Sequence, residues 1–243
     1  MFQNKKIIEN AFSKEELENF EKGGGVFWNP DGVFKQVLVR PLIDHLEDKI
    51  DFSEVKVILD IGSRDACQSL ELNRFFPNAK ILAFEPVPSS YEYCLKNTSN
   101  INEVEVYPYA VSDFNGKTEF YEVFNGNVGA SSLLRSLNPN WMQRKIEVEC
   151  INIENFLKTK NIEKVDIIWA DVQGAEELVF NSLGSFLPKT KAIATEIGLT
   201  NLYENGSSEY DLSKILIDFE LVDSQKTPDM TEADQIYLNK SIL

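Results

Sequence analysis

The chain has 243 residues, 43% of them hydrophobic, and its 39 acidic and 24 basic residues give a formal net charge of −15 at pH 7. That length fits one large α/β domain better than two small ones. A strongly acidic protein repels phosphate backbones and anionic lipid surfaces, so the composition argues against nucleic acid or a membrane surface as a partner.

The cysteines and the N-terminus predict the compartment. Cys67, Cys94 and Cys150 are an odd number of cysteines at wide spacing, which predicts buried free thiols rather than a disulfide framework or a zinc site. Residues 1–20 are charged and lack a continuous apolar core, so we expect no signal peptide. No apolar run approaches the roughly 20 residues that span a membrane. We therefore expect a soluble, cytoplasmic protein.

The N-terminal part differs from the rest of the chain. A polar helical segment ends at a break rich in glycine and proline at 23–32. The apolar spacing within 33–50 predicts a helix, which Pro41 is expected to kink. We therefore expect an N-terminal helical extension over 1–50 and the main domain over 51–243.

Short apolar runs and helical segments alternate along most of the remaining chain. The runs that predict parallel strands are 55–61, 79–85, 104–111, 165–172 and 191–197. The segments that predict helices are 67–76, 89–100, 175–187 and 208–219, with Ser89 or Ser90 as the expected cap of the second. This alternation indicates βαβ units around a parallel sheet.

Two regions depart from the alternation. Residues 117–124 and 145–151 predict strands on either side of a turn-rich stretch, 125–140, which we expect to be a long surface loop. The chain ends with FELVDSQ and DQIYLNK, two segments typical of an antiparallel hairpin. The expected fold is therefore α/β and Rossmann-like, with a mainly parallel seven-strand sheet and an antiparallel hairpin at its edge.

Acidic residues recur at or just after the ends of the predicted core strands. They are Asp60, Glu85, Asp113, Asp171 and Glu196. Because the carboxyl ends of parallel strands meet at one edge of the sheet, where ligands bind in this architecture, we expect these side chains to share a cleft.

Glu85 has the spacing of a ribose-binding residue. It stands 23 residues after Gly62, in the loop that follows the first strand, and an acidic residue at this distance binds ribose hydroxyls in this architecture. The alternative is an ordinary solvated glutamate at a strand end.

The loop after the first strand, DIGSRDA, lacks the further glycines that let backbone approach a pyrophosphate, and Asp65 would repel one. S-adenosylmethionine has ribose and adenine but no phosphate, and its sulfonium and amino groups are positive. The acidic strand ends suit this ligand better than NAD or ATP.

Five motifs in series resemble the FkbM family of S-adenosylmethionine-dependent O-methyltransferases. They are VILDIG, FEP, AVSD, DVQGAE and TEI, and the resemblance covers roughly residues 55–222. The segment LTNLYENG is also similar to the tail of a subgroup that acts on sugars. The chain has DIGSRDA where members commonly have DIGAN followed by glycine, and Gln173 where glutamate is frequent.

The resemblance implies a class I methyltransferase fold and a place for each part of the cofactor. The methionine part would contact Asp60, Gly62 and Ser63, the ribose Glu85, and the adenine Ala110 and Val111 with Asp113 nearby. Asp171 would lie beside the transferred methyl group, and Gly174 would allow close backbone approach.

Methyl transfer to a hydroxyl needs alignment of the reacting atoms and removal of a proton. Asp171 is the first candidate base and Glu196 the second. The alternative for Asp171 is to position the cofactor amine or to cap the following helix. No ligand spacing supports a metal.

The acceptor must be bound by the irregular segments. Trp28, Ser131, Ser132 and Tyr203 are the candidates, because aromatic rings suit a sugar and the serines can donate hydrogen bonds or cap a turn. The predicted function is O-methylation of a sugar hydroxyl in a glycan or glycosylated metabolite. The alternatives are a nicotinamide-dependent oxidoreductase on a similar sheet and a non-catalytic cofactor-binding domain. The sequence leaves open whether the protein forms a homodimer.

Overall fold

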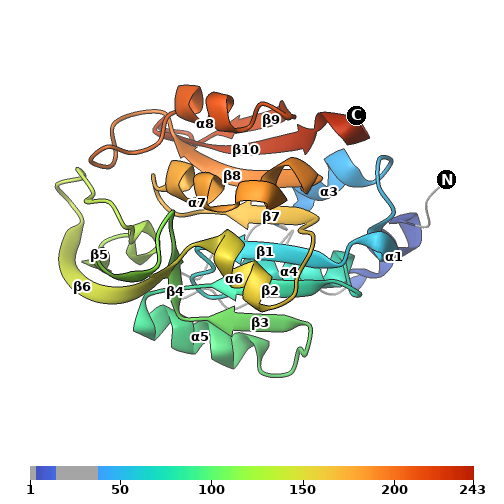
Figure 1. Ribbon diagram of the computed structural model, residues 1–243, viewed down its shortest axis with the longest axis horizontal. Helices are drawn as coiled ribbons and strands as arrows, with labels where there is room; N and C mark the ends of the chain where they lie inside the picture. The colour runs from blue at the N-terminus through green and yellow to red at the C-terminus, as the bar shows by residue number, and fades with distance from the viewer. Residues whose placement is uncertain (1–3, 15–37) are drawn as a thin grey trace.

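The structure is a computed structural model that describes residues 4–14 and 38–243. Its centre is a seven-stranded sheet with the strand order β3-β2-β1-β7-β8-β10-β9 (Figure 1). The strands are β1 (Val57–Ile61), β2 (Lys80–Phe84), β3 (Val104–Tyr107), β7 (Ile167–Ala170), β8 (Ala192–Gly198), β9 (Phe219–Lys226) and β10 (Glu232–Asn239).

The sheet is mainly parallel. The pairs β1–β2, β1–β7, β2–β3 and β7–β8 are parallel, whereas β10 runs antiparallel to both β8 and β9. The predicted seven-strand sheet with an antiparallel hairpin at its edge is therefore confirmed.

The helices lie on both faces of this sheet. They are α1 (Asn4–Asn10), α3 (Arg40–Leu46), α4 (Cys67–Phe75), α5 (Pro88–Thr98), α6 (Ile153–Thr159), α7 (Glu176–Ser182) and α8 (Glu209–Ile215). Short 3-10 turns occupy Phe52–Glu54, Val128–Ala130, Gly184–Lys189 and Lys240–Ile242. None of the helices in 4–14 and 38–243 has the length and apolar character needed to cross a bilayer.

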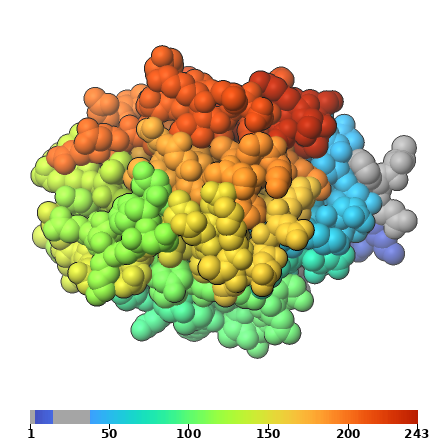
Figure 2. Space-filling model, in the orientation of Figure 1, coloured from blue at the N-terminus to red at the C-terminus, as the bar shows by residue number. Residues whose placement is uncertain are grey.

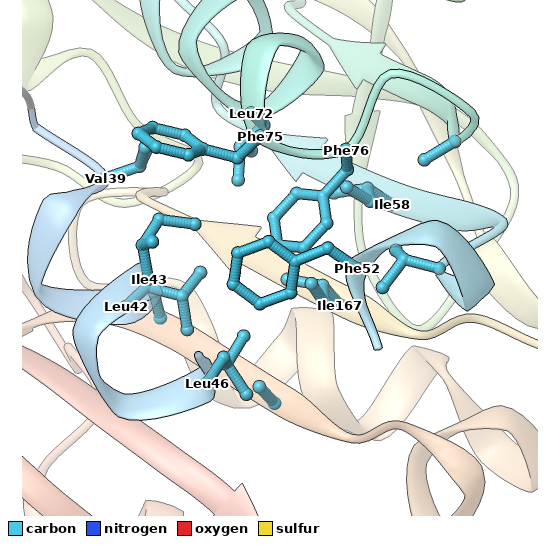
Figure 3. Packing of buried hydrophobic residues seen from close by; sticks show 14 of the residues in the cluster. Val39, Leu42, Ile43, Leu46, Phe52, Ile58, Leu72, Phe75, Phe76 and Ile167 are labelled. Atoms are coloured by element: carbon cyan, nitrogen blue, oxygen red, sulfur yellow. The ribbon is translucent and has the colours of Figure 1, made fainter. Parts of the chain in front are cut away.

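Alternate residues of the strands face two different cores, as a sheet covered on both sides requires. On β1, Ile58 packs with residues of α3 and α4, while Leu59 packs with residues of α6, α7 and α8. In the first core Phe52 and Phe76 have ring centroids 4.8 Å apart, and the apolar side chains of α3 point toward them (Figure 3). Cys67, Cys94 and Cys150 are buried free thiols, as predicted.

Prolines begin two of the helices. Pro41 lies in the first turn of α3 rather than kinking its middle. Pro88 opens α5 with Val87 as N-cap, so neither Ser89 nor Ser90 caps that helix. Pro suits this position because its missing N–H would have no intrahelical partner there. With 15–37 outside the described residues, the division of the chain at residue 50 stays a prediction.

The predicted strand 104–111 forms two strands in two sheets. Pro108 separates β3 from β4 (Tyr109–Val111), which pairs in parallel with β6 (Met142–Ile151). Proline cannot donate to a strand ladder, so the chain changes partner at this residue. A long β5 (Gly116–Asn125) completes the second, three-stranded sheet as an antiparallel neighbour of β6.

The second sheet forms one end of the molecule, opposite α1 and α3 (Figure 1), and its surface is continuous with that of the neighbouring segments in the space-filling view (Figure 2). The stretch 125–140 was expected to be a surface loop, but it is anchored at two places. Ser132 bridges to Tyr121, and Ser136 bridges to Tyr203. This anchoring fixes the segment beside the carboxyl ends of the main strands.

Candidate active site

A cavity of about 210 Å³ lies at the carboxyl ends of β1, β2, β7 and β8. Most of its lining comes from three groups of residues: the strand ends, β4, and the turn between β5 and β6. From the strand ends come Gly62, Arg64, Glu85, Asp171, Gln173 and Glu196, from β4 come Ala110 and Val111, and from the turn come Asn127, Gly129 and Ser131. Of the five acidic residues expected to share a cleft, Glu85, Asp171 and Glu196 line this cavity, whereas Asp60 and Asp113 do not.

Gly62 brings the first loop against the end of β7. Its φ is +84°, and a Cβ at this position would lie only 1.8 Å from the carbonyl oxygen of Asp171. The N–H groups of Gly62 and Ser63 both donate to the carbonyl of Phe84 at 3.0 Å. No residue with a side chain can make this approach, so this one glycine joins the three strand ends.

Asp60 and Ser63 lie behind this loop rather than on the cavity wall. Asp60 Oδ2 accepts hydrogen bonds from Ser63 Oγ at 2.7 Å and Ser69 Oγ at 2.5 Å. Burial raises the pKa of Asp60 to about 6. Its Oδ1 is buried and has no hydrogen-bond partner among the described residues. Of the three residues expected at the methionine part, only Gly62 lines the cavity.

Glu85 is 6% exposed and lines the cavity. Its two carboxylate oxygens accept the backbone N–H groups of Arg64 at 2.9 Å and Val87 at 2.7 Å. Burial raises the pKa of Glu85 to about 7. Each oxygen can accept a further hydrogen bond, so the fixed carboxylate can receive the two hydroxyls of a ribose.

Two of the three residues expected near the adenine line the cavity, and the third does not. Ala110 and Val111 are buried and line the cavity. Asp113 is exposed and outside the cavity lining, where it accepts a hydrogen bond from Ser112 Oγ at 3.2 Å. The chain turns away from the sheet after β4, which carries Asp113 to the surface.

Gln173 connects the two candidate bases. Its Nε2 donates to Asp171 Oδ1 at 2.6 Å and to Glu196 Oε2 at 2.6 Å. Its Oε1 accepts from the hydroxyl of Tyr203 at 2.7 Å. Gln173 has a φ of +57° and Gly174 one of +94°, so the left-handed turn after β7 aims the amide back between the carboxylates. The family motif places Gln173 here, but only the structure shows this bridge.

The bridge affects the protonation of both acids. Burial raises the pKa of Asp171, an effect that the hydrogen bond from Gln173 and the positive charge of Arg64 partly offset. Burial, and then the charge of Asp171, raises the pKa of Glu196. Because the charge of Asp171 opposes ionisation of Glu196, the pair favours a state in which one of the two carboxyls is protonated.

The expected acceptor residues lie in different environments. Ser131 lines the cavity, and its Oγ accepts from the N–H of Val123 and donates to the carbonyl of Val128, each at 3.0 Å. Ser132 is buried outside the lining and donates to the carbonyl of Val172 at 3.1 Å. Trp28 lies outside the described residues.

Tyr203 packs against the turn that follows β7. It is 5% exposed and absent from the cavity lining. A Cβ on Gly174 would lie 3.1 Å from its ring, so Gly174 is the residue that lets the turn rest on Tyr203. The ring therefore holds Gln173 in place and offers no face for stacking a sugar.

Glu232 joins the cavity without any local sequence signal. It begins β10, pairs with Gly198 at the end of β8, and lines the cavity. Burial raises the pKa of Glu232 to about 7. Its position depends on the register of the hairpin, which the residue pattern alone does not define.

The residues present fit S-adenosylmethionine. The close backbone approach at Gly62 and the carboxylates of Glu85 and Asp171 on the cavity wall suit a ligand that has ribose hydroxyls and positive charges. A pyrophosphate would face acidic side chains from four strands. Within 4–14 and 38–243, no group of three or more His, Cys, Asp or Glu side chains is arranged to hold a metal.

Comparison with known proteins agrees with this chemistry. The family model "Methyltransferase FkbM domain" matches residues 57–235. The chain is 30% identical over 198 residues to "2-O-methyltransferase NoeI" of Sinorhizobium fredii (strain NBRC 101917 / NGR234), a match that covers 76% of this chain and 80% of that protein.

Two solved structures share the fold at low identity. The fibrillarin/Nop5p complex has a TM-score of 0.52 at 12% identity and covers 89% of this chain and 88% of that chain. The METTL16 MTase domain has a TM-score of 0.51 at 13% identity, and the match covers 92% of this chain and 77% of that domain's chain. The chain belongs to the FkbM family and is an S-adenosylmethionine-dependent O-methyltransferase.

Proposed function

We propose that the enzyme methylates a hydroxyl of a sugar, in a glycan or a glycosylated metabolite. The observation that carries this proposal is the position of Asp171 and Glu196. These two side chains line the cofactor cavity and also a second cavity of about 120 Å³ on the face of the sheet covered by α3. A group that removes the proton from an acceptor hydroxyl needs such a position between donor and acceptor.

The second cavity has the side chains of a sugar site. It is lined by the indole of Trp169, by the amides of Gln68 and Gln225, and by the carboxylates of Asp223 and Asp234. An aromatic face covers the apolar face of a sugar ring, while amides and carboxylates pair with its hydroxyls. The acidic lining favours a neutral or amino sugar over a sugar phosphate. The relative from S. fredii is named a 2-O-methyltransferase, which also supports an oxygen acceptor.

In the first cavity Glu85 would hold the ribose, and Ala110 and Val111 would flank the adenine. S-adenosylmethionine supplies a methyl group that is bonded to a positively charged sulfur. The neutral thioether that remains after methyl transfer is a good leaving group. The protein aligns the acceptor oxygen, excludes water and removes the acceptor proton.

Asp171 is the proposed general base. The amide of Gln173 fixes its carboxylate at 2.6 Å, and the positive charge of Arg64 favours its ionised form. Glu196, held by the same amide at 2.6 Å and with its pKa raised by burial and by the charge of Asp171, would stay protonated and orient the acceptor hydroxyl.

The test is transfer of a labelled methyl group from S-adenosylmethionine to a panel of methyl glycosides, with the product located by mass spectrometry. We expect a methyl ether on one ring hydroxyl. Asp171→Asn should lower kcat by roughly 100-fold or more, a much larger loss than its effect on cofactor affinity. The matched control is Asp113→Asn, at the exposed site outside the cavity, which should keep full activity. Transfer to phenols or amines with no transfer to sugars would overturn the proposal, and so would an Asp171→Asn variant with full activity.

A further inference from the structure

Arg64 is the one positively charged side chain among the described residues that line the cofactor cavity. The other charged lining residues are Glu85, Asp171, Glu196 and Glu232. S-adenosylmethionine carries two cations, its sulfonium and its ammonium, and one anion, the methionine carboxylate. The acidic lining residues can face the sulfonium and the ammonium of the cofactor. The methionine carboxylate has a partner of opposite charge in the cavity only if it faces Arg64.

The backbone of the first loop has few donors left for an anion. The N–H groups of Gly62 and Ser63 donate to Phe84, and that of Ala66 donates to the carbonyl of Ser63 at 2.8 Å. The N–H of Arg64 donates to Glu85 at 2.9 Å. Glycine-rich loops hold anions with such groups, but here the protein itself uses them.

The start of α4 is also occupied by an anion. The N–H of Cys67, the first residue of α4, donates to Asp65 Oδ1 at 3.2 Å, and Asp65 is 5% exposed. A buried carboxylate therefore already lies at the positive end of the helix dipole. A second carboxylate at this helix end would meet repulsion, so a side chain must supply the anion site.

The geometry directs the Arg64 guanidinium across the cavity. Arg64 has a φ of +54°, a conformation that is unfavourable for a residue with a side chain. The turn between β5 and β6 makes room for the guanidinium, because a Cβ on Gly129 would lie 3.0 Å from its Nη1. Burial raises the pKa values of Glu85 and Asp171, and the nearby positive charge of Arg64 offsets part of that rise for both carboxyls.

We propose that the guanidinium of Arg64 binds the methionine carboxylate of S-adenosylmethionine. The planar guanidinium pairs with a carboxylate through two parallel hydrogen bonds, which fixes the methionine end of the cofactor. Arg64 thereby takes the role that further glycines of the first loop would have in other members. This inference rests on the cofactor and is independent of the acceptor.

The experiment is calorimetric titration with S-adenosylmethionine and with decarboxylated S-adenosylmethionine, which differ only in this carboxylate. Arg64→Ala should weaken binding of S-adenosylmethionine by roughly 10- to 100-fold and leave binding of the decarboxylated compound within about 3-fold. Arg64→Lys should show an intermediate loss for S-adenosylmethionine, because lysine keeps the charge but not the paired geometry. Arg135→Ala, which removes an exposed ion pair with Glu204, should change neither affinity.

Gly129→Ala provides a second variant that leaves Arg64 in place. The added methyl group would lie 3.0 Å from Nη1 and would push the guanidinium away slightly, so a smaller loss, again selective for S-adenosylmethionine, is expected. Equal weakening of both ligands by Arg64→Ala and Gly129→Ala would overturn the proposal, since it would mean that Arg64 only shapes the loop. Unchanged binding of S-adenosylmethionine would also overturn it. A wild-type protein that binds neither ligand would contradict the cofactor itself.

Discussion

Gly62 and the carbonyl of Asp171 are in such close approach that a single methyl group on Gly62 would lie 1.8 Å from the carbonyl oxygen. This contact joins the loop after β1, which carries cofactor-binding groups, to the end of β7, which carries the proposed base. The cofactor cavity and the reaction centre are therefore one structural unit.

Gly62→Ala should disrupt that unit. The variant has both a clash with backbone and a φ of +84°, so we expect it to be destabilised by about 2 kcal/mol or more. Thermal unfolding measures the loss, and calorimetry should show no S-adenosylmethionine binding. Gly116→Ala is the matched control: its φ is also positive, at +132°, but its Cβ would meet no atom within 4 Å. Equal effects of the two substitutions would contradict the role of the contact.

Glu85→Gln should weaken cofactor binding by roughly 10- to 100-fold. The amide has the size of the carboxylate but replaces one acceptor by a donor, which opposes the N–H of Arg64 or Val87 and loses a ribose hydrogen bond. Calorimetric titration of both proteins measures the change. Glu92→Gln on the exposed side of α5 is the control and should bind as the wild type does. Binding equal to that of the wild type in Glu85→Gln would exclude the ribose role.

Gln173→Leu should lower the rate of methyl transfer and leave cofactor binding nearly unchanged. The variant removes the amide that donates to Asp171 and Glu196, so the two carboxylates lose their common partner and their fixed positions. We expect kcat to fall roughly 10- to 100-fold, with the cofactor dissociation constant changed by less than about 3-fold. The pH dependence of kcat should also shift. A variant with normal kcat and weaker cofactor binding would show that Gln173 serves the cofactor instead.

The stability of the free protein should fall as the pH rises from about 5 to about 8. Burial raises the pKa of Glu71 to about 7, whereas an unfolded glutamate titrates near about 4.3. The folded state therefore holds a proton that the unfolded state releases, and the stabilisation is lost as the pH rises through this window. Asp60 and Glu85, with pKa values raised to about 6 and about 7, act in the same direction.

Glu71→Gln tests the contribution of one group. Glu71 lies away from the active site and accepts the N–H of Val39 at 3.0 Å, a bond that the glutamine oxygen can keep. Urea unfolding at pH 5 and pH 8 should show a smaller loss of stability in the variant, by up to roughly 3 kcal/mol. An identical pH dependence in both proteins would exclude Glu71 as a buried proton-binding group.

The fold was predictable because the pattern of each element is local. β-branched runs such as 55–61 and 191–197 indicate buried strands, and the alternation with helices indicates a parallel sheet. The change of sheet at Pro108 was missed because a proline shows where a ladder stops but not where the next strand pairs. The burial of Ser132 and Ser136 was missed because their partners, Tyr121 and Tyr203, are distant in the sequence.

The sequence predicted that the site lies at the carboxyl edge of the main sheet, but it did not predict the contacts within the site. Position at a strand end brought Glu85, Asp171 and Glu196 to the cavity. Asp60 lies inside β1, where the alternation of the strand turns its side chain toward Ser63 and Ser69. The bridge made by Gln173 depends on a left-handed turn and on a second strand, and neither leaves a mark in local composition.

The central claim is that the methyl donor lies between Gly62, Glu85 and Asp171. A crystal structure of the protein grown with S-adenosylhomocysteine tests it most directly. We predict ribose hydroxyls within hydrogen-bond distance of Glu85, the adenine against Ala110 and Val111, and the sulfur toward Asp171. A nucleoside bound elsewhere, or bound here with its ribose away from Glu85, would contradict the account.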